Sequence, residues 1–239
     1  MANWTAVIPV KRLGAAKSRL RGAVPTARHE DLALAMLRDT AAAVTACAEV
    51  AELLVVTDDP SAAEAAADLG ARVVPEPHGF AGRSAPSGGP VAGDSTDLSL
   101  NDAMRYGADT VAGLDRYRAV LAGDLPALDK GELAAALVAA SGAPAARSFV
   151  ADAAGTGTTL LAAPRGVELD PLFGVGSAAA HAGSGAAALS GDWPGLRQDV
   201  DTAADLRTVL ALGPGPYTRA LLRDLGLVAN GGTSRLPAA

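Results

Sequence analysis

The hydrophobic positions of this chain alternate between two spacings. Residues 4–10 form a short continuous apolar run, as expected for a strand buried on both faces. Residues 28–47 then repeat hydrophobic positions every three or four residues, the spacing of an amphipathic helix. The succession continues, with strands predicted over 51–60, 71–77 and 116–128 and helices over 61–70, 98–113 and 129–140. This alternation predicts an α/β fold with a single doubly wound, mostly parallel sheet.

The second half of the chain departs from this alternation. Residues 146–164 read as two strands around a Gly-Thr turn, which predicts a β-hairpin inserted into the sheet. Residues 173–186 form a Gly- and Ser-rich loop that opens a short helix, and residues 197–213 form an extended piece followed by a helix. A separate stretch, 76–95, is crowded with Gly, Pro and Ser, and its conformation stays open.

No internal repeat and no clear linker divides the chain. We therefore expect one domain over residues 1–215, followed by a C-terminal extension over 216–239. The Gly- and Ser-containing end of this extension, residues 230–239, is predicted to be disordered.

Composition and charge exclude several classes of protein. The 239 residues are 49% hydrophobic and carry a net charge of −6, which argues against a broad basic face for nucleic acid or a membrane surface. The lone Cys47 excludes an internal disulfide and a cysteine-based zinc site, and it is expected to be a buried hydrophobe. Without an apolar run of about 18 residues or a basic start before the first apolar run, the sequence predicts a cytoplasmic protein.

Four cations follow the first predicted strand within nine residues: Lys11, Arg12, Lys17 and Arg19. Ligands of open α/β sheets bind at the carboxyl ends of the strands. A local basic loop on an acidic protein therefore predicts a small phosphorylated ligand, with Arg12 the cation expected to face solvent. The loop contains neither a Gly-Lys-Ser/Thr phosphate loop nor the G-x-G-x-x-G pattern of dinucleotide sites.

Aspartates follow other predicted strands, at the same edge of the sheet. Carboxylates beside phosphate-binding cations suit a nucleotide with Mg²⁺, although each aspartate alone also has an ordinary interpretation. Asp58 and Asp59, before Pro60, look like a helix start, and Asp124 could be a solvated turn residue. Asp201 or Thr202 is expected to cap the helix that follows, with Asp201 preferred, which leaves Asp199 to face a ligand.

Two glycine-rich motifs in the second half keep more than one interpretation. The sequence GTGT at 155–158 is most simply a hairpin turn. The sequence GVGS at 174–177 could present backbone N–H groups to a phosphate, or it could be a flexible connection. His181, which follows it, is more typical of a packing or surface histidine than of a ligand.

The order of the motifs is more specific than any one of them. PVKRLGAAKSRL, VVTDDP, DLSLNDAM, GDLPAL and DVDTAADL succeed one another between residues 5 and about 212. This succession resembles nucleotidyltransferases with a glycosyltransferase-A-like fold. It is most similar to the phosphoenolpyruvate/2-phospho-L-lactate guanylyltransferase family of coenzyme F-420 biosynthesis, and the first motif and the pair GTGT and FGVGSAAAH carry most of that similarity.

The resemblance implies a binding site for GTP in the first half of the chain. In such a site the basic loop would surround the triphosphate, with Lys11, Lys17 and Arg19 as contacts and Lys17 as a catalytic residue. Asn101, in the motif SLNDA, would lie near the nucleoside.

The resemblance also implies a metal site and an acid site. Asp124 would be catalytic and hold Mg²⁺, and Asp199 would share a second Mg²⁺. Thr156, Gly174 and Ser177 match the positions that hold the phosphorylated acid in this family.

The implied reaction transfers GMP from GTP to phosphoenolpyruvate and releases pyrophosphate. 2-Phospho-L-lactate and, less well, 3-phosphoglycerate are alternative acids, and the alanine- and glycine-rich composition, typical of high-GC actinobacteria, favours phosphoenolpyruvate. Molybdopterin-type or sugar-phosphate nucleotidyltransferases would begin with a Gly-rich loop in place of the basic one. A non-catalytic nucleotide-binding subunit would lack carboxylates such as Asp124 and Asp199. The reactive product suggests direct hand-over to the next enzyme of the pathway.

Overall fold

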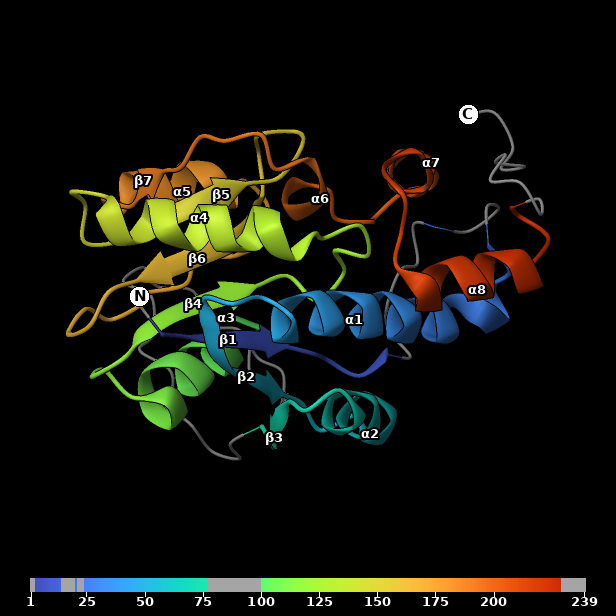
Figure 1. Ribbon diagram of the computed structural model, residues 1–239, viewed down its shortest axis with the longest axis horizontal. Helices are drawn as coiled ribbons and strands as arrows, with labels where there is room; N and C mark the ends of the chain where they lie inside the picture. Colours follow the sequence, from blue (N-terminus) through green and yellow to red (C-terminus); the bar gives the residue numbers. More distant parts are fainter. Residues whose placement is uncertain (1–2, 14–19, 21–23, 77–99, 229–239) are drawn as a thin grey trace, which may run out of the picture.

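One seven-stranded sheet organises the structure (Figure 1). The computed structural model describes residues 3–13, 20, 24–76 and 100–228. The strands lie in the order β3-β2-β1-β4-β6-β5-β7. Their bounds are β1 Trp4–Pro9, β2 Val50–Val56, β3 Arg72–Val74, β4 Tyr117–Leu121, β5 Ser148–Ala151, β6 Thr158–Ala163 and β7 Ala187–Ala188.

The strand directions confirm the α/β prediction and the hairpin in the second half. β1 runs parallel to β2 and β4, and β2 runs parallel to β3. β6 is antiparallel to both β4 and β5, with Leu121 opposite Leu160. Because of this reversal, the start of β6 lies at the edge of the sheet where β1 and β4 end.

Helices cover both faces of the sheet (Figure 1). α1 and α4 pack on one face, and α3 and α5 pack on the other. The helices are α1 His29–Thr45, α2 Pro60–Asp68, α3 Leu100–Arg105, α4 Lys130–Gly142, α5 Ser177–Gly183, α6 Pro194–Arg197, α7 Ala203–Leu212 and α8 Pro216–Asp224, with a short 3₁₀ turn η3 at Thr26–Arg28 and a π-helix η4 at Tyr106–Ala112.

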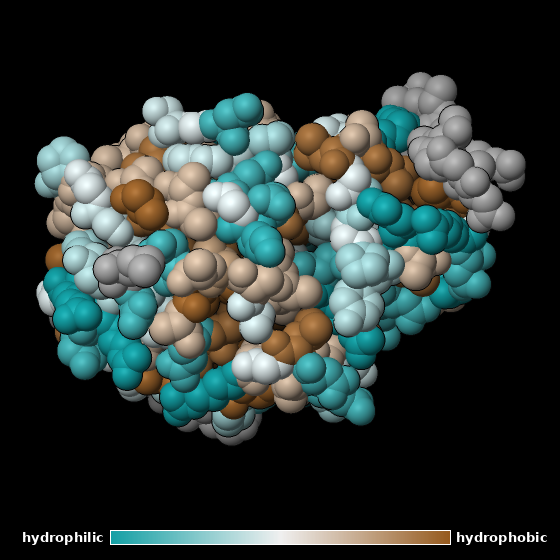
Figure 2. All heavy atoms as spheres, in the orientation of Figure 1, coloured by the Kyte–Doolittle hydropathy of each residue, from teal (hydrophilic) through white to brown (hydrophobic). Residues whose placement is uncertain are grey.

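Alternate residues of each central strand enter opposite core layers. In β1, Ile8 packs on the side of α1 and α4, whereas Val7 packs on the side of α3. Both side chains are fully buried, which explains why the strand reads as an unbroken apolar run. Cys47 is a free thiol buried in the first of these layers, as predicted. The surface in Figure 2 intersperses hydrophilic and hydrophobic side chains.

The helix predicted over 98–113 changes its form along its length. In the described part, α3 continues directly into the π-helix η4. Gly107 lies where this helix meets the sheet, and a Cβ there would approach Val7 to 2.7 Å and Val56 to 2.8 Å. The close contact between helix and sheet therefore needs a residue without a side chain.

Three predictions about chain ends and caps have different outcomes. Asp129 caps α4, as predicted, by accepting the N–H groups of Gly131 and Glu132. The predicted cap by Asp201 is wrong: Thr202 caps α7, because its hydroxyl and the Asp205 carboxylate form a reciprocal capping box. The predicted tail, 230–239, lies outside the described residues, as does nearly all of 76–95.

α8 packs against α1 through a buried carboxylate. Asp39 accepts the backbone N–H groups of Tyr217 at 3.1 Å and Thr218 at 2.8 Å, at the start of α8.

The domain boundary after residue 215 stays a prediction. In the part of the chain that the structure describes, no helix combines the length and apolarity needed to cross a bilayer.

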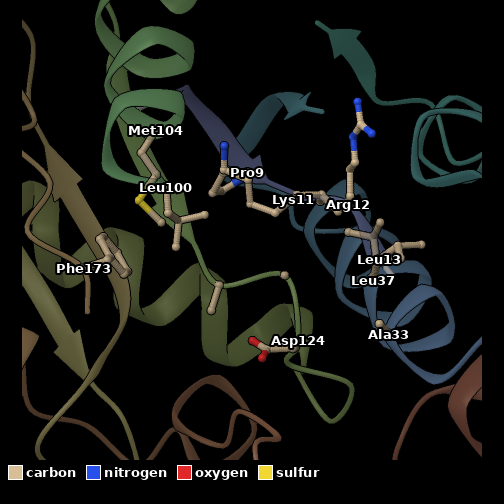
Figure 3. A pocket seen from close by; sticks show the side chains of 13 residues that line it. Pro9, Lys11, Arg12, Leu13, Ala33, Leu37, Leu100, Met104, Asp124 and Phe173 are labelled. Atoms are coloured by element: carbon tan, nitrogen blue, oxygen red, sulfur yellow. The ribbon is translucent and has the colours of Figure 1, made fainter. Parts of the chain in front are cut away.

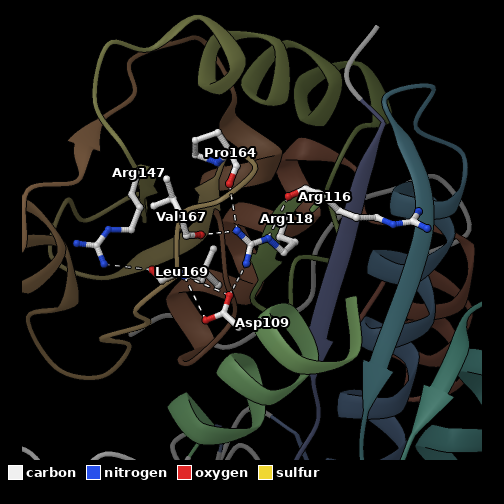
Figure 4. Close-up of polar contacts among 7 residues, drawn as sticks. All are labelled: Asp109, Arg116, Arg118, Arg147, Pro164, Val167 and Leu169. Carbon is white, nitrogen blue, oxygen red and sulfur yellow. Dashed lines mark hydrogen bonds and ion pairs between the residues drawn. The ribbon is translucent and has the colours of Figure 1, made fainter. Parts of the chain in front are cut away.

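Arg118, near the start of β4, forms a buried ion pair with Asp109 of the π-helix (Figure 4). The Arg118 side chain is fully buried and also donates to the carbonyl oxygens of Arg116, Pro164 and Val167. Asp109 in turn accepts the Leu169 N–H at 3.3 Å. Burial raises the pKa of the Asp109 carboxyl, and the Arg118 charge opposes that rise. The pair thus ties the π-helix and the segment 164–169 to the sheet.

Replacing Arg118 with methionine is expected to destabilise the fold strongly. The change leaves Asp109 buried without its counter-charge, so we expect the free energy of unfolding to fall by about 3 to 5 kcal/mol. Urea denaturation followed by circular dichroism measures this change. Arg72→Met is the matched control, because Arg72 forms an exposed 3.5 Å ion pair with Glu52 whose loss costs at most about 1 kcal/mol. Equal losses in the two variants would contradict the account.

Candidate active site

A first cavity of about 300 Å³ opens where β1 and β4 end (Figure 3). The segment Pro9–Leu13 forms one wall, and Gly123 and Asp124 form another. Asp124 projects its carboxylate toward the open space, whereas Arg12 is exposed and its guanidinium points away, as predicted. The parallel pairing of β1 with β4 brings these two strand ends together.

The described start of the basic loop is held from the neighbouring strand. The backbone N–H of Leu13 donates to the Asp59 carboxylate at 3.1 Å, and the same side chain caps α2, which confirms the predicted helix start. Lys11 forms a 2.8 Å ion pair with Glu76, which is nearly buried. Residues 11–13 therefore leave β1 in a fixed direction. Lys17 and Arg19 lie outside the described residues.

A second, larger cavity of about 840 Å³ lies between the hairpin turn and the start of α5. The three positions predicted to hold the acid, Thr156, Gly174 and Ser177, all line it. Asp199 lines it as well, as do Asp152 and Asp201. Residues that are distant in sequence but share a predicted role thus meet in one space, although their roles stay predictions.

The backbone of the hairpin turn is fixed at both ends of Thr156. Its N–H donates to the Asp152 carboxylate at 2.8 Å, and its carbonyl oxygen accepts the Ala178 N–H at 3.1 Å. The Ser177 N–H in turn donates to the Gly174 carbonyl oxygen at 3.1 Å. Two of the backbone N–H groups at the start of α5 are therefore already used within the protein.

The backbone conformation at position 174 requires a glycine. Its φ of +140° is one that residues with a side chain rarely adopt. The turn that follows brings Ser177, whose side chain is buried, to the wall of the second cavity. The glycine in the motif FGVGS is thus explained by the shape of the loop.

Leu100 and Phe173 line both cavities and form their common wall. Asn101, beside Leu100 on α3, joins the two sides of this wall. Its amide nitrogen donates to the Phe173 carbonyl oxygen at 3.0 Å, and its amide oxygen accepts the Phe173 N–H at 2.7 Å. A contact of Asn101 with a nucleoside stays a prediction.

The carboxylates around the two cavities fit a magnesium site completed by substrate. In the described segments, no three His, Cys, Asp or Glu side chains gather into a protein-only metal site. Mg²⁺ commonly binds through one or two carboxylates together with phosphate oxygens. Asp124 in the first cavity and Asp199 in the second are carboxylates of this kind.

Comparison with known proteins assigns the chain to a family. A phosphoenolpyruvate guanylyltransferase from Salinispora arenicola is 55% identical over 218 residues, which cover 91% of this chain and 92% of that protein. The chain belongs to the phosphoenolpyruvate guanylyltransferase family. A second member, from Geodermatophilus obscurus, is 49% identical over 92% of this chain and 94% of its own length.

The fold is shared with more distant proteins as well. A protein from Desulfovibrio desulfuricans G20 assigned as a nucleotide-diphospho-sugar transferase superposes with a TM-score of 0.63. The alignment covers 95% of this chain and 96% of that one, at 16% identity, so it supports the fold alone. No protein-family model matches the chain.

The sequence alone did not identify three of the residues that line the two cavities. Asp152 could have been noticed, because an aspartate shortly before a Gly-Thr-Gly turn often accepts the turn's N–H groups. Leu100 and Phe173 gave no such signal, since each reads as an ordinary apolar residue and their common wall appears only in three dimensions.

His181 is a fully buried residue that packs behind the second cavity wall. Its Nε2 accepts the Leu172 N–H at 2.9 Å, and its Nδ1 lies 2.9 Å from the Thr158 hydroxyl. Its ring also meets Phe173 edge-on, with centroids 5.1 Å apart. Burial lowers the pKa of His181 to about 4, and the nearby Arg147 charge adds to the effect. The interpretation of His181 as a packing residue is thus confirmed.

The depressed pKa of His181 predicts a loss of stability in mild acid. The folded protein holds this ring neutral, so its contribution is present above pH 6.5 and is lost as the pH falls toward 4. Between pH 7 and 5 the loss amounts to about 2 kcal/mol. Urea denaturation of the unmodified protein and of His181→Asn at several pH values isolates the loss of stability that protonation of His181 causes. An equally steep fall in the variant would contradict the assignment.

Proposed function

We propose that this protein is a phosphoenolpyruvate guanylyltransferase, which transfers GMP from GTP to phosphoenolpyruvate and releases pyrophosphate. Family membership over nine-tenths of the chain supports this reaction. The observation that carries the proposal is the meeting of Thr156, Gly174, Ser177 and Asp199 in one cavity, separated by a single wall from the cavity of Lys11 and Asp124.

Each cavity suits one of the two substrates. In this proposal the nucleotide occupies the first cavity, where apolar residues such as Leu37 and Met104 can contact the base and ribose. The basic loop then surrounds the triphosphate, with Lys11, Lys17 and Arg19 as its cations. Phosphoenolpyruvate occupies the second cavity, against Thr156, Gly174 and Ser177.

The reaction needs positioning and charge neutralisation more than proton transfer. A phosphate oxygen of phosphoenolpyruvate attacks the α-phosphorus of GTP, and the bond from that phosphorus to the β-phosphate oxygen breaks. With a second pKa near about 6, the phosphate of the acid is mostly a dianion at neutral pH, so no general base is required. The protein's task is to hold the attacking oxygen in line with the leaving pyrophosphate, and Lys17 can stabilise the charge that develops there.

Asp124 and Asp199 are the residues proposed to hold magnesium. With Mg²⁺ bound to these carboxylates, part of the phosphate charge would be neutralised. Asp124 lies three residues after the end of β4, and its carboxylate points into the first cavity. Asp199 precedes α7 and approaches from the side of the second cavity.

The proposed reaction would place the protein in coenzyme F-420 biosynthesis. The product, an enolpyruvyl group joined to GMP through a diphosphate, retains a reactive phosphoanhydride. Direct hand-over to the next enzyme and a cytoplasmic location stay predictions, whereas the names of the relatives favour phosphoenolpyruvate over other small phosphorylated acids.

The substrate assignment is tested by supplying GTP and Mg²⁺ with one acid at a time. Phosphoenolpyruvate is expected to give the fastest pyrophosphate release, with 2-phospho-L-lactate and 3-phosphoglycerate slower, and mass spectrometry should identify the GMP adduct. ATP in place of GTP tests the base preference. Pyrophosphate release that requires none of these acids, or no release at all, would refute the proposed function.

Removing the Asp124 carboxylate is expected to abolish most of the activity. Asp124→Asn keeps the size of the side chain but loses a charged ligand of Mg²⁺, so we expect kcat/KM to fall by about 100-fold or more. Chelation of Mg²⁺ should have the same effect on the unmodified protein. Asp224→Asn, a surface change on α8, is the matched control and should keep activity within about twofold. Full activity in Asp124→Asn would exclude Asp124 from the metal site.

A further inference from the structure

The Asn101 side chain holds the wall between the two cavities, because both polar atoms of its amide form hydrogen bonds with the backbone of Phe173. Asn101 is the second residue of α3, next to Leu100, and Phe173 precedes the Gly174 turn, 72 residues away in sequence. The two reciprocal hydrogen bonds, at 2.7 and 3.0 Å, connect the Asn101 amide to the Phe173 backbone. A carboxamide can donate and accept in one plane, so it fixes both the distance and the rotation of the peptide that it contacts.

We propose that Asn101 is a positioning residue that aligns the acid cavity with the nucleotide cavity through Phe173. This inference rests on the proposed function and assigns a task to a residue that family resemblance associates with the nucleoside. Phe173 is directly followed by Gly174, a proposed acid contact, so a shift of the Phe173 backbone moves the acid relative to the nucleotide. In-line transfer is sensitive to such shifts.

The rest of the Phe173 segment is fixed from the acid side. His181 accepts the Leu172 N–H and contacts the Phe173 ring, and His181 itself bonds Thr158 at the start of β6. Asn101 is the anchor contributed by α3, the helix that lines the nucleotide cavity through Leu100 and Met104. Without the Asn101 side chain, the Phe173 segment therefore stays attached to β6 and α5 but loses its hydrogen bonds to α3, which lines the nucleotide cavity.

This role and a direct nucleoside contact predict different kinetics. A nucleoside contact would raise KM for GTP in Asn101→Ala and leave kcat/KM for phosphoenolpyruvate, measured at saturating GTP, unchanged. Positioning through Phe173 predicts the opposite. At saturating GTP, kcat/KM for phosphoenolpyruvate falls about tenfold or more, while KM for GTP stays within about twofold.

A second measurement follows the hydrogen bond itself and needs no turnover. The Phe173 N–H donates to the Asn101 amide oxygen, so its exchange with solvent deuterium, followed by NMR, should accelerate about tenfold or more in Asn101→Ala. Asn101→Asp keeps an acceptor for that N–H but places a carboxylate oxygen against the Phe173 carbonyl oxygen. It should therefore show the kinetic defect as well.

Arg105→Ala is the matched control, because it removes the Arg105–Asp102 ion pair from the same helix without touching Phe173. It should leave the Phe173 exchange rate and both kinetic parameters unchanged. Faster Phe173 exchange together with the selective loss toward phosphoenolpyruvate supports the proposal. A selective rise in KM for GTP, an unchanged kcat/KM for phosphoenolpyruvate, or an unchanged Phe173 exchange rate overturns it. An inactive unmodified protein would count against the proposed function instead, and the Phe173 exchange rate would still decide whether Asn101 holds the wall.

Discussion

The candidate site depends on the reversed direction of one strand. β6 is antiparallel to β4, and Leu121 lies opposite Leu160, so the chain enters β6 at the edge where β1 and β4 end. The hydrogen bond from the Ala122 N–H to the Thr159 carbonyl oxygen extends this pairing to the last residue before Gly123. Had β6 run parallel to β4, the turn carrying Thr156 would lie at the opposite edge. Two cavities could not then share a wall.

Buried polar groups hold the segment that leads from the end of β6, at the opposite edge of the sheet, back to the site. Arg118 and Asp109 tie the segment 164–169 to β4, and His181 holds the next residues through the Leu172 N–H. Asn101 holds Phe173 from the other side. Each of these contacts uses a side chain to fix a backbone that has no strand or helix of its own. In the proposed reaction, where positioning matters more than proton transfer, such contacts contribute to the rate without touching the reacting atoms.

The sequence predicted elements whose signals are local and missed contacts that depend on distant residues. The apolar run of β1, the spacing of α1 and the Gly-Thr turn between β5 and β6 lie within short windows, and all three predictions are confirmed. Asp201 and Thr202 are adjacent, and both are residue types that cap helices. The sequence therefore did not decide between them, because the outcome depended on the reciprocal hydrogen bonds between Thr202 and Asp205.

The same limit applies to the candidate site. The resemblance to a known family grouped Thr156, Gly174 and Ser177 by role, and the structure brings them into one cavity. The contact of Asn101 with Phe173 joins a side chain to a backbone 72 residues away, which no spacing in the sequence records. The buried Arg118 was hidden for a similar reason, because its partner Asp109 belongs to a helix and not to a neighbouring strand position.

The central claim is that the nucleotide and the acid occupy separate cavities divided by Leu100 and Phe173. A crystal structure with Mg²⁺, phosphoenolpyruvate and a GTP analogue that resists attack at its α-phosphorus tests it most directly. The account predicts the nucleotide beside Pro9–Leu13 and Asp124, and the acid against Thr156, Gly174 and Ser177. Both ligands on one side of the wall, or the two ligands in exchanged cavities, would contradict it.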